Sequence, residues 1–151
     1  MILDDILTKK RKDLEELKVR LPLARLQKIA ESRTTFIRRN FKQALQNTKK
    51  INIIAELKKA SPSEGLLRED FQPMRLAEIY EISGASAISI LTEPHYFMGR
   101  SSYLKTVRQV TSIPLLRKDF IFERYQIYET AILEADAFLL ISSLLSEEEL
   151  R

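Results

Sequence analysis

The chain contains no cysteine, and only 3 of its 151 residues are glycine and 5 are proline. Without cysteine, neither a disulfide framework nor a thiolate metal site can form, which agrees with a reducing compartment and leads us to expect a cytoplasmic protein. The low glycine and proline content excludes collagen-like and disordered classes. No apolar run is long enough to cross a membrane, and the first residues lack the apolar core of a signal peptide, so no membrane association is expected.

What the sequence does contain is the composition of a globular domain, with 44% hydrophobic and 30% charged residues. Positive charge is unevenly distributed, because residues 1–50 hold 14 Lys and Arg against 6 Asp and Glu, whereas residues 51–151 hold 11 against 15. A basic arm can bind nucleic acid. Here, however, the basic residues alternate with apolar ones at helical spacing, and no aromatic stacking platform accompanies them. We therefore interpret this segment as a solvated or substrate-attracting face and expect no nucleic-acid partner.

The apolar pattern predicts helices first, and alternating strands and helices after residue 50. Leucines recur at helical spacing up to Pro22, which ends the first predicted helix. Short apolar runs further along predict buried strands separated by helices. The predicted helices are 2–21, 23–31, 36–45, 74–84, 101–110 and 123–134, and the predicted strands are 51–57, 87–91, 114–116 and 137–141. A loop is predicted at 61–65, and Ser146 with the glutamates after it is typical of the start of a further helix.

This βαβ alternation is typical of a parallel sheet, which two architectures use. An open doubly wound sheet would carry a glycine-rich turn after its first strand, and none is present. A (β/α)8 barrel carries its chemistry on the loops after the strands, where the unusual polar residues of this sequence stand. We therefore predict an α/β fold, the N-terminal portion of a (β/α)8 TIM barrel, with a helical extension at 1–50 and about four βα units at 51–151.

Charged residues stand at the ends of otherwise apolar predicted strands. Glu56 and Lys58 are two residues apart and project to the same face, where a carboxylate and an ammonium can hold each other ionised. Lys118 ends the third strand, as Glu93 ends the second, and a lysine in such a place can act as a general acid. Taken alone, each charged pair is more typical of an ordinary strand-end salt bridge or turn than of an active site. His95, the single histidine, has no metal-ligand partner nearby and is expected to be a loop residue.

Four segments, in order, carry a resemblance to a known family. They are 53–65 (IIAELKKASPSEG), 87–99 (AISILTEPHYFMG), 114–121 (PLLRKDFI) and 135–141 (ADAFLLI). Together they resemble the first four strands and adjoining loops of the indole-3-glycerol phosphate synthases, nearly without gaps over residues 51–151. The helices expected in residues 1–50 are similar to the extra N-terminal helices of that family.

The resemblance implies a carboxy-lyase of tryptophan biosynthesis. Its substrate is a small phosphorylated molecule, 1-(2-carboxyphenylamino)-1-deoxyribulose 5-phosphate, which closes to indole-3-glycerol phosphate with loss of carbon dioxide and water, without a metal or an organic cofactor. By that resemblance, Lys118 is the general acid toward the ribulose carbonyl, Lys58 binds the substrate carboxylate or phosphate, and Glu56 orients the lysines. It also implies four substrate-binding residues, which are Ser61, holding the phosphate or the loop beside it, and Phe97, Phe120 and Leu139 around the anthranilate ring.

Two departures from the family pattern carry expectations of their own. Glu134 stands where the family usually has glycine, so we expect a strained turn if the backbone there needs a positive φ. The family's second acid/base carboxylate and its main phosphate-binding loops have no counterpart in residues 1–151. We therefore expect this 151-residue chain, taken alone, to be catalytically inactive.

Three alternatives remain open at the level of sequence. A phosphoribosylanthranilate isomerase is expected to use a Cys and Asp pair, and the absence of cysteine together with Glu56-x-Lys58 disfavours it. A half-barrel that acts as a structural or binding module would self-associate through its exposed sheet, which light scattering tests. Nucleic-acid binding by residues 1–50 predicts a steeply salt-dependent affinity for any duplex.

Overall fold

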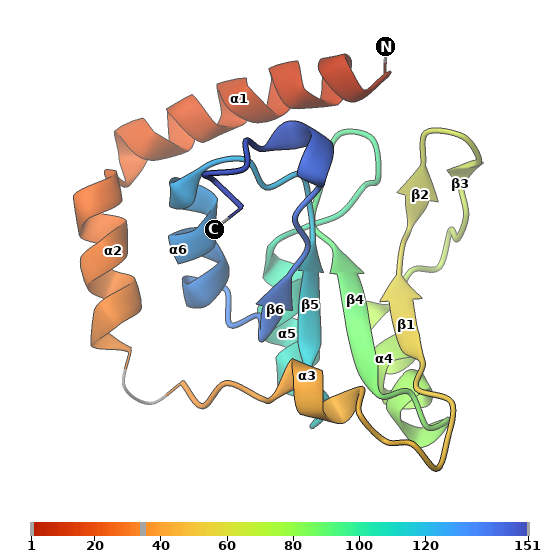
Figure 1. Cartoon of the computed structure of the whole chain (residues 1–151). Helices are drawn as coiled ribbons and strands as arrows, with labels where there is room; N and C mark the ends of the chain where they lie inside the picture. Colours follow the sequence, from red (N-terminus) through yellow and green to blue (C-terminus); the bar gives the residue numbers. More distant parts are fainter. Residues whose placement is uncertain (1, 34–35, 151) are drawn as a thin grey trace.

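A four-stranded parallel sheet forms the centre of the computed structural model, which describes residues 2–33 and 36–150 (Figure 1). The strand order is β1-β4-β5-β6. The strands are β1 (Ile54–Leu57), β4 (Ala87–Leu91), β5 (Leu115–Lys118) and β6 (Ala137–Phe138), and the helices between them are α4 (Pro73–Ile82), α5 (Ser102–Arg108) and α6 (Arg124–Ile132). The βα alternation and the parallel pairing predicted from the sequence are therefore confirmed. The outer limits of the predicted segments, residues 1 and 151, lie outside the described residues.

The main core lies between one face of the sheet and helices α4 and α5, which stand behind the sheet in Figure 1. Its members are aliphatic side chains from the strands, from these two helices and from the turn before β6. They are Leu57, Leu76, Ala77, Ile88, Ile90, Leu104, Val107, Leu115 and Ala135. Because burial of one large aliphatic side chain stabilises the fold by about 1.5–3 kcal/mol, this face is held firmly against the helices.

The helix ends follow from local sequence signals. Pro73 occupies the first turn of α4, where its fixed φ suits the helix and its missing N–H costs nothing. At the start of α6, Glu123 and Gln126 form a reciprocal capping box, in which each side chain accepts a backbone N–H of the other residue. Gly84 follows α4 with φ 91°, the left-handed conformation that glycine adopts without strain.

Two N-terminal helices, α1 (Ile2–Arg20) and α2 (Leu23–Ser32), confirm the helices predicted at 2–21 and 23–31. In Figure 1, α1 lies across the edge toward which β4 and β5 point, and α2 runs beside α6. A second core cluster joins these helices to the rest, through Leu14, Leu26, Phe122 and Tyr125. The Tyr125 hydroxyl also donates to the carbonyl oxygen of Leu21 at 2.9 Å, so the C-terminal end of α1 is attached to α6.

The helix predicted at 36–45 is wrong over its first half, because only α3 (Phe41–Ala44) is helical. Residues 36–40 are held by tertiary hydrogen bonds instead. The Arg39 backbone N–H donates to Asp136 Oδ1 at 2.7 Å, and the Arg39 guanidinium donates to the Ile113 carbonyl at 2.8 Å. These long-range bonds replace the local ones that a helix would need, which the apolar spacing of the segment does not reveal.

Three further differences from the sequence prediction are local. The predicted loop at 61–65 is the turn of a small antiparallel hairpin, β2 (Ala60–Ser61) and β3 (Gly65–Leu66). The strand predicted at 137–141 keeps only two residues in the ladder, and the 3-10 turn η1 (Ser142–Leu144) follows it. Ser146 caps the segment after it as predicted, because its Oγ accepts the Glu149 N–H at 3.3 Å while Glu149 Oε2 accepts the Ser146 N–H at 2.8 Å, but residues 147–150 form turns and not the start of the predicted helix.

Glu134 has φ 66°, so the strained turn expected from its identity is present. The residue follows α6 in a left-handed C-terminal cap, with the Glu134 N–H donating to Ala131 O at 3.2 Å and the Ala135 N–H to Thr130 O at 3.4 Å. Two arginines offset part of the strain, since Arg33 lies 2.6 Å from the Glu134 carboxylate and Arg108 donates to the Glu134 carbonyl at 3.2 Å. The equivalent turn after α4 uses glycine.

We expect Glu134→Gly to be more stable than Glu134→Ala by about 1 kcal/mol, because both lose the carboxylate but only alanine keeps a Cβ at positive φ. Urea unfolding with unchanged m-values measures this difference. The wild type should lie between them, since its partly exposed ion pair contributes at most about 1 kcal/mol. Equal midpoints for the glycine and alanine variants would contradict the assigned strain.

Candidate active site

The carboxyl ends of β1 and β5 bring three predicted residues together. Lys118 Nζ lies 2.8 Å from Glu56 Oε2, and Lys58 Nζ lies 3.8 Å from Glu56 Oε1. The parallel register makes this meeting possible, because β4 pairs with both strands and places Leu91 opposite Lys118. One carboxylate thus lies between two ammonium groups, which leaves a net positive charge that attracts an anionic ligand.

A pocket of about 180 Å³ adjoins these charges. Every residue predicted for the site except Ser61 lines it; the full lining is Glu56, Lys58, Leu91, Phe97, Lys118, Asp119, Phe120, Leu139 and Ile141. The rings of Phe97 and Phe120 have centroids 6.2 Å apart and are tilted by 43°, a favourable aromatic arrangement that makes an apolar wall. Charge on one side and aromatic surface on the other suit a ligand that is both anionic and aromatic.

Ser61 lies in the β2–β3 hairpin and is buried. Its Oγ accepts the Glu64 N–H at 3.2 Å and lies 3.3 Å from the Glu64 carboxylate. These contacts shape the hairpin that follows β1. They do not bring Ser61 into the pocket.

Glu93 shapes the pocket from behind, a role that the sequence did not reveal. Its side chain is fully buried, and its two carboxylate oxygens accept the backbone N–H groups of His95, Tyr96 and Phe97 at 3.0, 2.7 and 3.1 Å. The loop after β4 therefore winds around this carboxylate, which sets Phe97 in the wall. The loop closes at Gly99, where a Cβ would stand only 2.4 Å from the Leu91 carbonyl oxygen. Glycine is required there for this close approach.

His95 is a loop residue, as expected, and its contact is with α1. His95 Nε2 lies 2.7 Å from Asp13 Oδ2, and the neighbouring Tyr96 ring has the Lys9 ammonium 4.7 Å from its centroid. The helix thus holds the outer side of the loop whose inner side carries Phe97. No group of three or more His, Asp or Glu side chains in the described part of the chain is placed to hold a metal ion.

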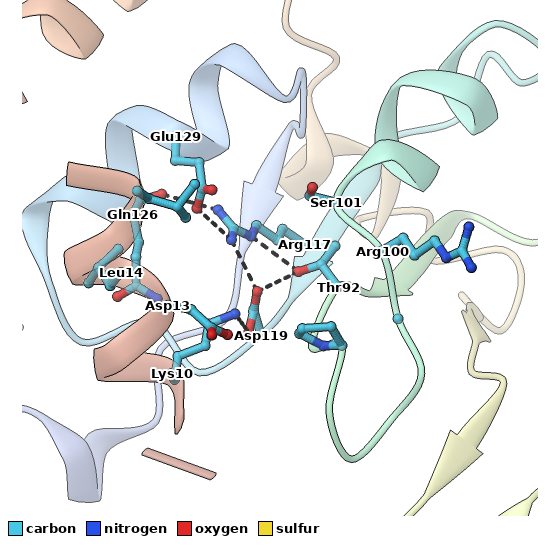
Figure 2. Close-up of a pocket in the computed structure, with 13 residues that line it drawn as sticks. Lys10, Asp13, Leu14, Thr92, Arg100, Ser101, Arg117, Asp119, Gln126 and Glu129 are labelled. Carbon is cyan, nitrogen blue, oxygen red and sulfur yellow. Dashed lines mark hydrogen bonds and ion pairs between the residues drawn. The ribbon is translucent and has the colours of Figure 1, made fainter. Parts of the chain in front are cut away.

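A buried ionic cluster lies behind the pocket, under α1 and α6 (Figure 2). Arg117 is only 2% exposed, and its guanidinium contacts Asp119 Oδ2 at 3.0 Å and Glu129 Oε2 at 2.7 Å. Lys10 reaches the cluster from α1 and lies 2.6 Å from Asp119 Oδ1. These four residues, with Thr92, form one network beside a cavity of about 300 Å³.

Electrostatics in this cluster favours the charged forms. Burial alone raises the pKa of Asp119, but the positive charges of Lys10 and Arg117 outweigh it and hold that pKa below its ordinary value. Likewise burial lowers the pKa of Arg117, and the carboxylates of Glu129 and Asp119 more than restore it. The sequence contained one sign of this cluster, an arginine and an aspartate within an apolar strand, but not their partners.

Fold and site together define a class. Parallel strands alternate with helices, and the ionisable side chains gather at the carboxyl ends of the strands, as in the first βα units of a (β/α)8 barrel. The chain belongs to the indole-3-glycerol phosphate synthase family, whose sequence model matches residues 3–151. Among the described residues, no helix is long and apolar enough to span a membrane.

Named relatives agree with this assignment. Over 151 residues the chain is 49% identical to an indole-3-glycerol phosphate synthase of Campylobacter jejuni (strain 81-176), matching 100% of this chain and 58% of that protein. It is 48% identical over 155 aligned residues to the synthase of Carboxydothermus hydrogenoformans, matching 100% of this chain and 59% of that protein. The chain therefore spans somewhat more than half the length of the relatives that it matches.

Proposed function

We propose that this chain provides the first part of an indole-3-glycerol phosphate synthase, including the lysine that drives ring closure. The observation that carries the proposal is the Glu56 carboxylate between Lys58 and Lys118, beside the wall of Phe97 and Phe120. The substrate proposed is 1-(2-carboxyphenylamino)-1-deoxyribulose 5-phosphate, which combines two anionic groups with an aromatic ring. The reaction is proposed to occur in the cytoplasm.

Ring closure requires a proton at the ribulose carbonyl. The aromatic carbon that bears the carboxylate attacks the carbonyl carbon, and the Lys118 ammonium gives its proton to the carbonyl oxygen as negative charge builds there. The bond to the carboxylate then breaks and releases carbon dioxide, and loss of water completes the indole. Glu56 holds the Lys118 ammonium in its charged, directed form.

Binding is assigned to the remaining residues of the pocket. Lys58 attracts the substrate carboxylate or phosphate, while Phe97, Phe120 and Leu139 surround the anthranilate ring and exclude water. Ser61 is proposed to act indirectly, since its contacts shape the hairpin after β1. Residues 1–50 are proposed as a helical extension and residues 51–151 as the barrel part.

The 151-residue chain by itself is expected to show no turnover. Its pocket of about 180 Å³ is smaller than the ~300–1,000 Å³ typical of ligand sites. The Lys118 side chain is also 40% exposed, so water is not excluded from the reacting groups. Incubation of the purified chain with substrate, followed by detection of indole-3-glycerol phosphate, checks this. Clear turnover would contradict it.

A chimera tests the function of the chain in a complete barrel. Residues 1–151 replace the matching 58% of the Campylobacter jejuni relative, whose own sequence completes the protein. The chimera is expected to form indole-3-glycerol phosphate and to restore growth of a bacterial strain that lacks its synthase. A folded chimera without turnover, beside an active parent enzyme, would overturn the proposed function.

A further inference from the structure

Strand β5 separates two sets of side chains. Lys118 lines the pocket, whereas the side chains of Arg117 and Asp119, its neighbours in sequence, are buried in the cluster beneath α1 and α6 (Figure 2), and Asp119 also borders the pocket. Side chains alternate between the two faces along a strand, so consecutive residues have different surroundings. Arg117 and Asp119 are nevertheless bonded to Lys118 through the backbone, so a displacement of either one also moves Lys118. The buried cluster is thus in a position to determine where the end of β5 lies.

Asp119 is the connection between this cluster and the pocket. Its Oδ2 accepts from Thr92 Oγ1 at 2.6 Å and from Arg117 at 3.0 Å, while its Oδ1 accepts from its neighbour Phe120 N–H at 2.9 Å. Phe120 is itself a wall residue of the pocket. The carboxylate therefore ties the backbone between Lys118 and Phe120 to the strand next to it.

Helix α1 reaches this carboxylate through Lys10. Its Nζ lies 2.6 Å from Asp119 Oδ1, and its side chain is only 11% exposed. Lys10 and Arg117 balance Asp119 and Glu129, so the buried cluster is neutral as a whole. Without the Lys10 charge, the cluster would hold two carboxylates against one guanidinium, at a place where unbalanced charge is costly.

We propose that Lys10 is a positioning residue, which docks α1 on the end of β5 and, through Asp119, sets the places of Lys118 and Phe120. The functional meaning rests on the proposed synthase activity, in which Lys118 gives the proton and Phe120 walls the ring. The physical coupling itself rests only on the contacts of Lys10 and Asp119.

The test compares four forms of the full chain: wild type, Lys10→Met, Lys10→Arg and Lys12→Met. Lys12 is the matched control, because it is an exposed lysine of the same helix. NMR follows the Lys118 side-chain Cε and Nζ signals and the exchange of the Phe120 amide. Trypsin cleavage after Lys9 and Arg11 reports whether α1 stays docked, and each Met variant removes one cleavage site.

Lys10→Met is expected to speed Phe120 amide exchange about tenfold, because the Asp119 acceptor loses its anchor. It should also shift the Lys118 signals and accelerate cleavage in α1. Lys10→Arg should restore all three, and Lys12→Met should match the wild type. Should Lys10→Met fail to fold, Lys10→Gln is measured in its place by the same criteria.

A loss of stability in Lys10→Met with unmoved Lys118 signals would overturn the proposal, since Lys10 would then be merely structural. Unchanged Phe120 exchange would overturn it equally. None of these readouts depends on turnover. A shifted Lys118 signal beside an inactive chimera would therefore reject the synthase function and leave the coupling intact.

Discussion

Replacement of Lys118 with alanine in the chimera is expected to lower kcat by roughly 10²–10⁴-fold, the range for loss of a positioned general acid. The proton for the carbonyl would then have to come from water, while the attacking ring carbon stays in place. Because Phe97, Phe120 and Leu139 remain, KM should change much less than kcat, the mark of an interaction made in the transition state. Steady-state kinetics of indole-3-glycerol phosphate formation separates the two constants.

Lys105→Ala is the control for this experiment, because Lys105 is an exposed lysine in the last turn of α5, away from the pocket. It should leave kcat unchanged. Near-normal kcat in Lys118→Ala would remove Lys118 from the chemical step. Equal losses in the two variants would point to damage of the fold.

Replacement of Arg117 with methionine is expected to lower the free energy of unfolding by about 3–5 kcal/mol, because it leaves buried carboxylates without their main partner. The guanidinium is nearly inaccessible, and besides its two carboxylate contacts it donates to Thr130 Oγ1 at 2.9 Å and to Thr92 Oγ1 at 3.2 Å. Methionine fills much of the volume but satisfies none of these groups. Urea unfolding measures the loss.

The matched control is Lys58→Met, which removes a cation from the end of a strand on the open side of the sheet. Its ion pair with Glu56 is long and partly solvated, so the expected change is within about 1 kcal/mol. Similar losses in the free energy of unfolding for the two variants would show that the buried Arg117 cluster stabilises the fold no more than the partly solvated ion pair of Lys58.

The Arg117 variant should also unfold at a higher pH than the wild type. The folded pKa of Asp119 is depressed, so its contribution to stability is present above the unfolded value of about 3.9 and is lost as the pH falls through the folded pKa. Loss of Arg117 removes one of the two cations that depress this pKa. The acid-induced loss of stability then begins at a higher pH. Circular dichroism followed from pH 7 to pH 2 detects the shift.

The charged residues of the pocket could be predicted from the sequence, because residue type and position at the end of an apolar strand are local properties. Glu56, Lys58 and Lys118 interrupt apolar strands at their carboxyl ends, and the structure places all three around one pocket. Glu134 shows the same kind of success, since its positive φ follows from a turn that usually takes glycine. Their catalytic roles remain predictions.

Two features of the structure were not predicted correctly from the sequence. Residues 36–40 were expected to be helical, yet Arg39 binds Asp136 and Ile113 across the fold. Glu93 was recognised only as the end of a strand, although three backbone N–H groups converge on it. In both cases the partners that decide the conformation could not be identified from local apolar spacing.

By itself, the sequence determined the order of strands and helices, the family, and the positions of two lysines at strand ends. This was possible because apolar periodicity and motif sequences are properties of neighbouring residues. Only the tertiary structure decided that one carboxylate lies between those lysines and that Lys10 of the first helix reaches Asp119 behind them. The physical reason is that ion pairs are set by distance in space. Lys10 and Asp119 meet only when α1 lies over the end of β5, and the local sequence of neither segment predicts the other as its partner.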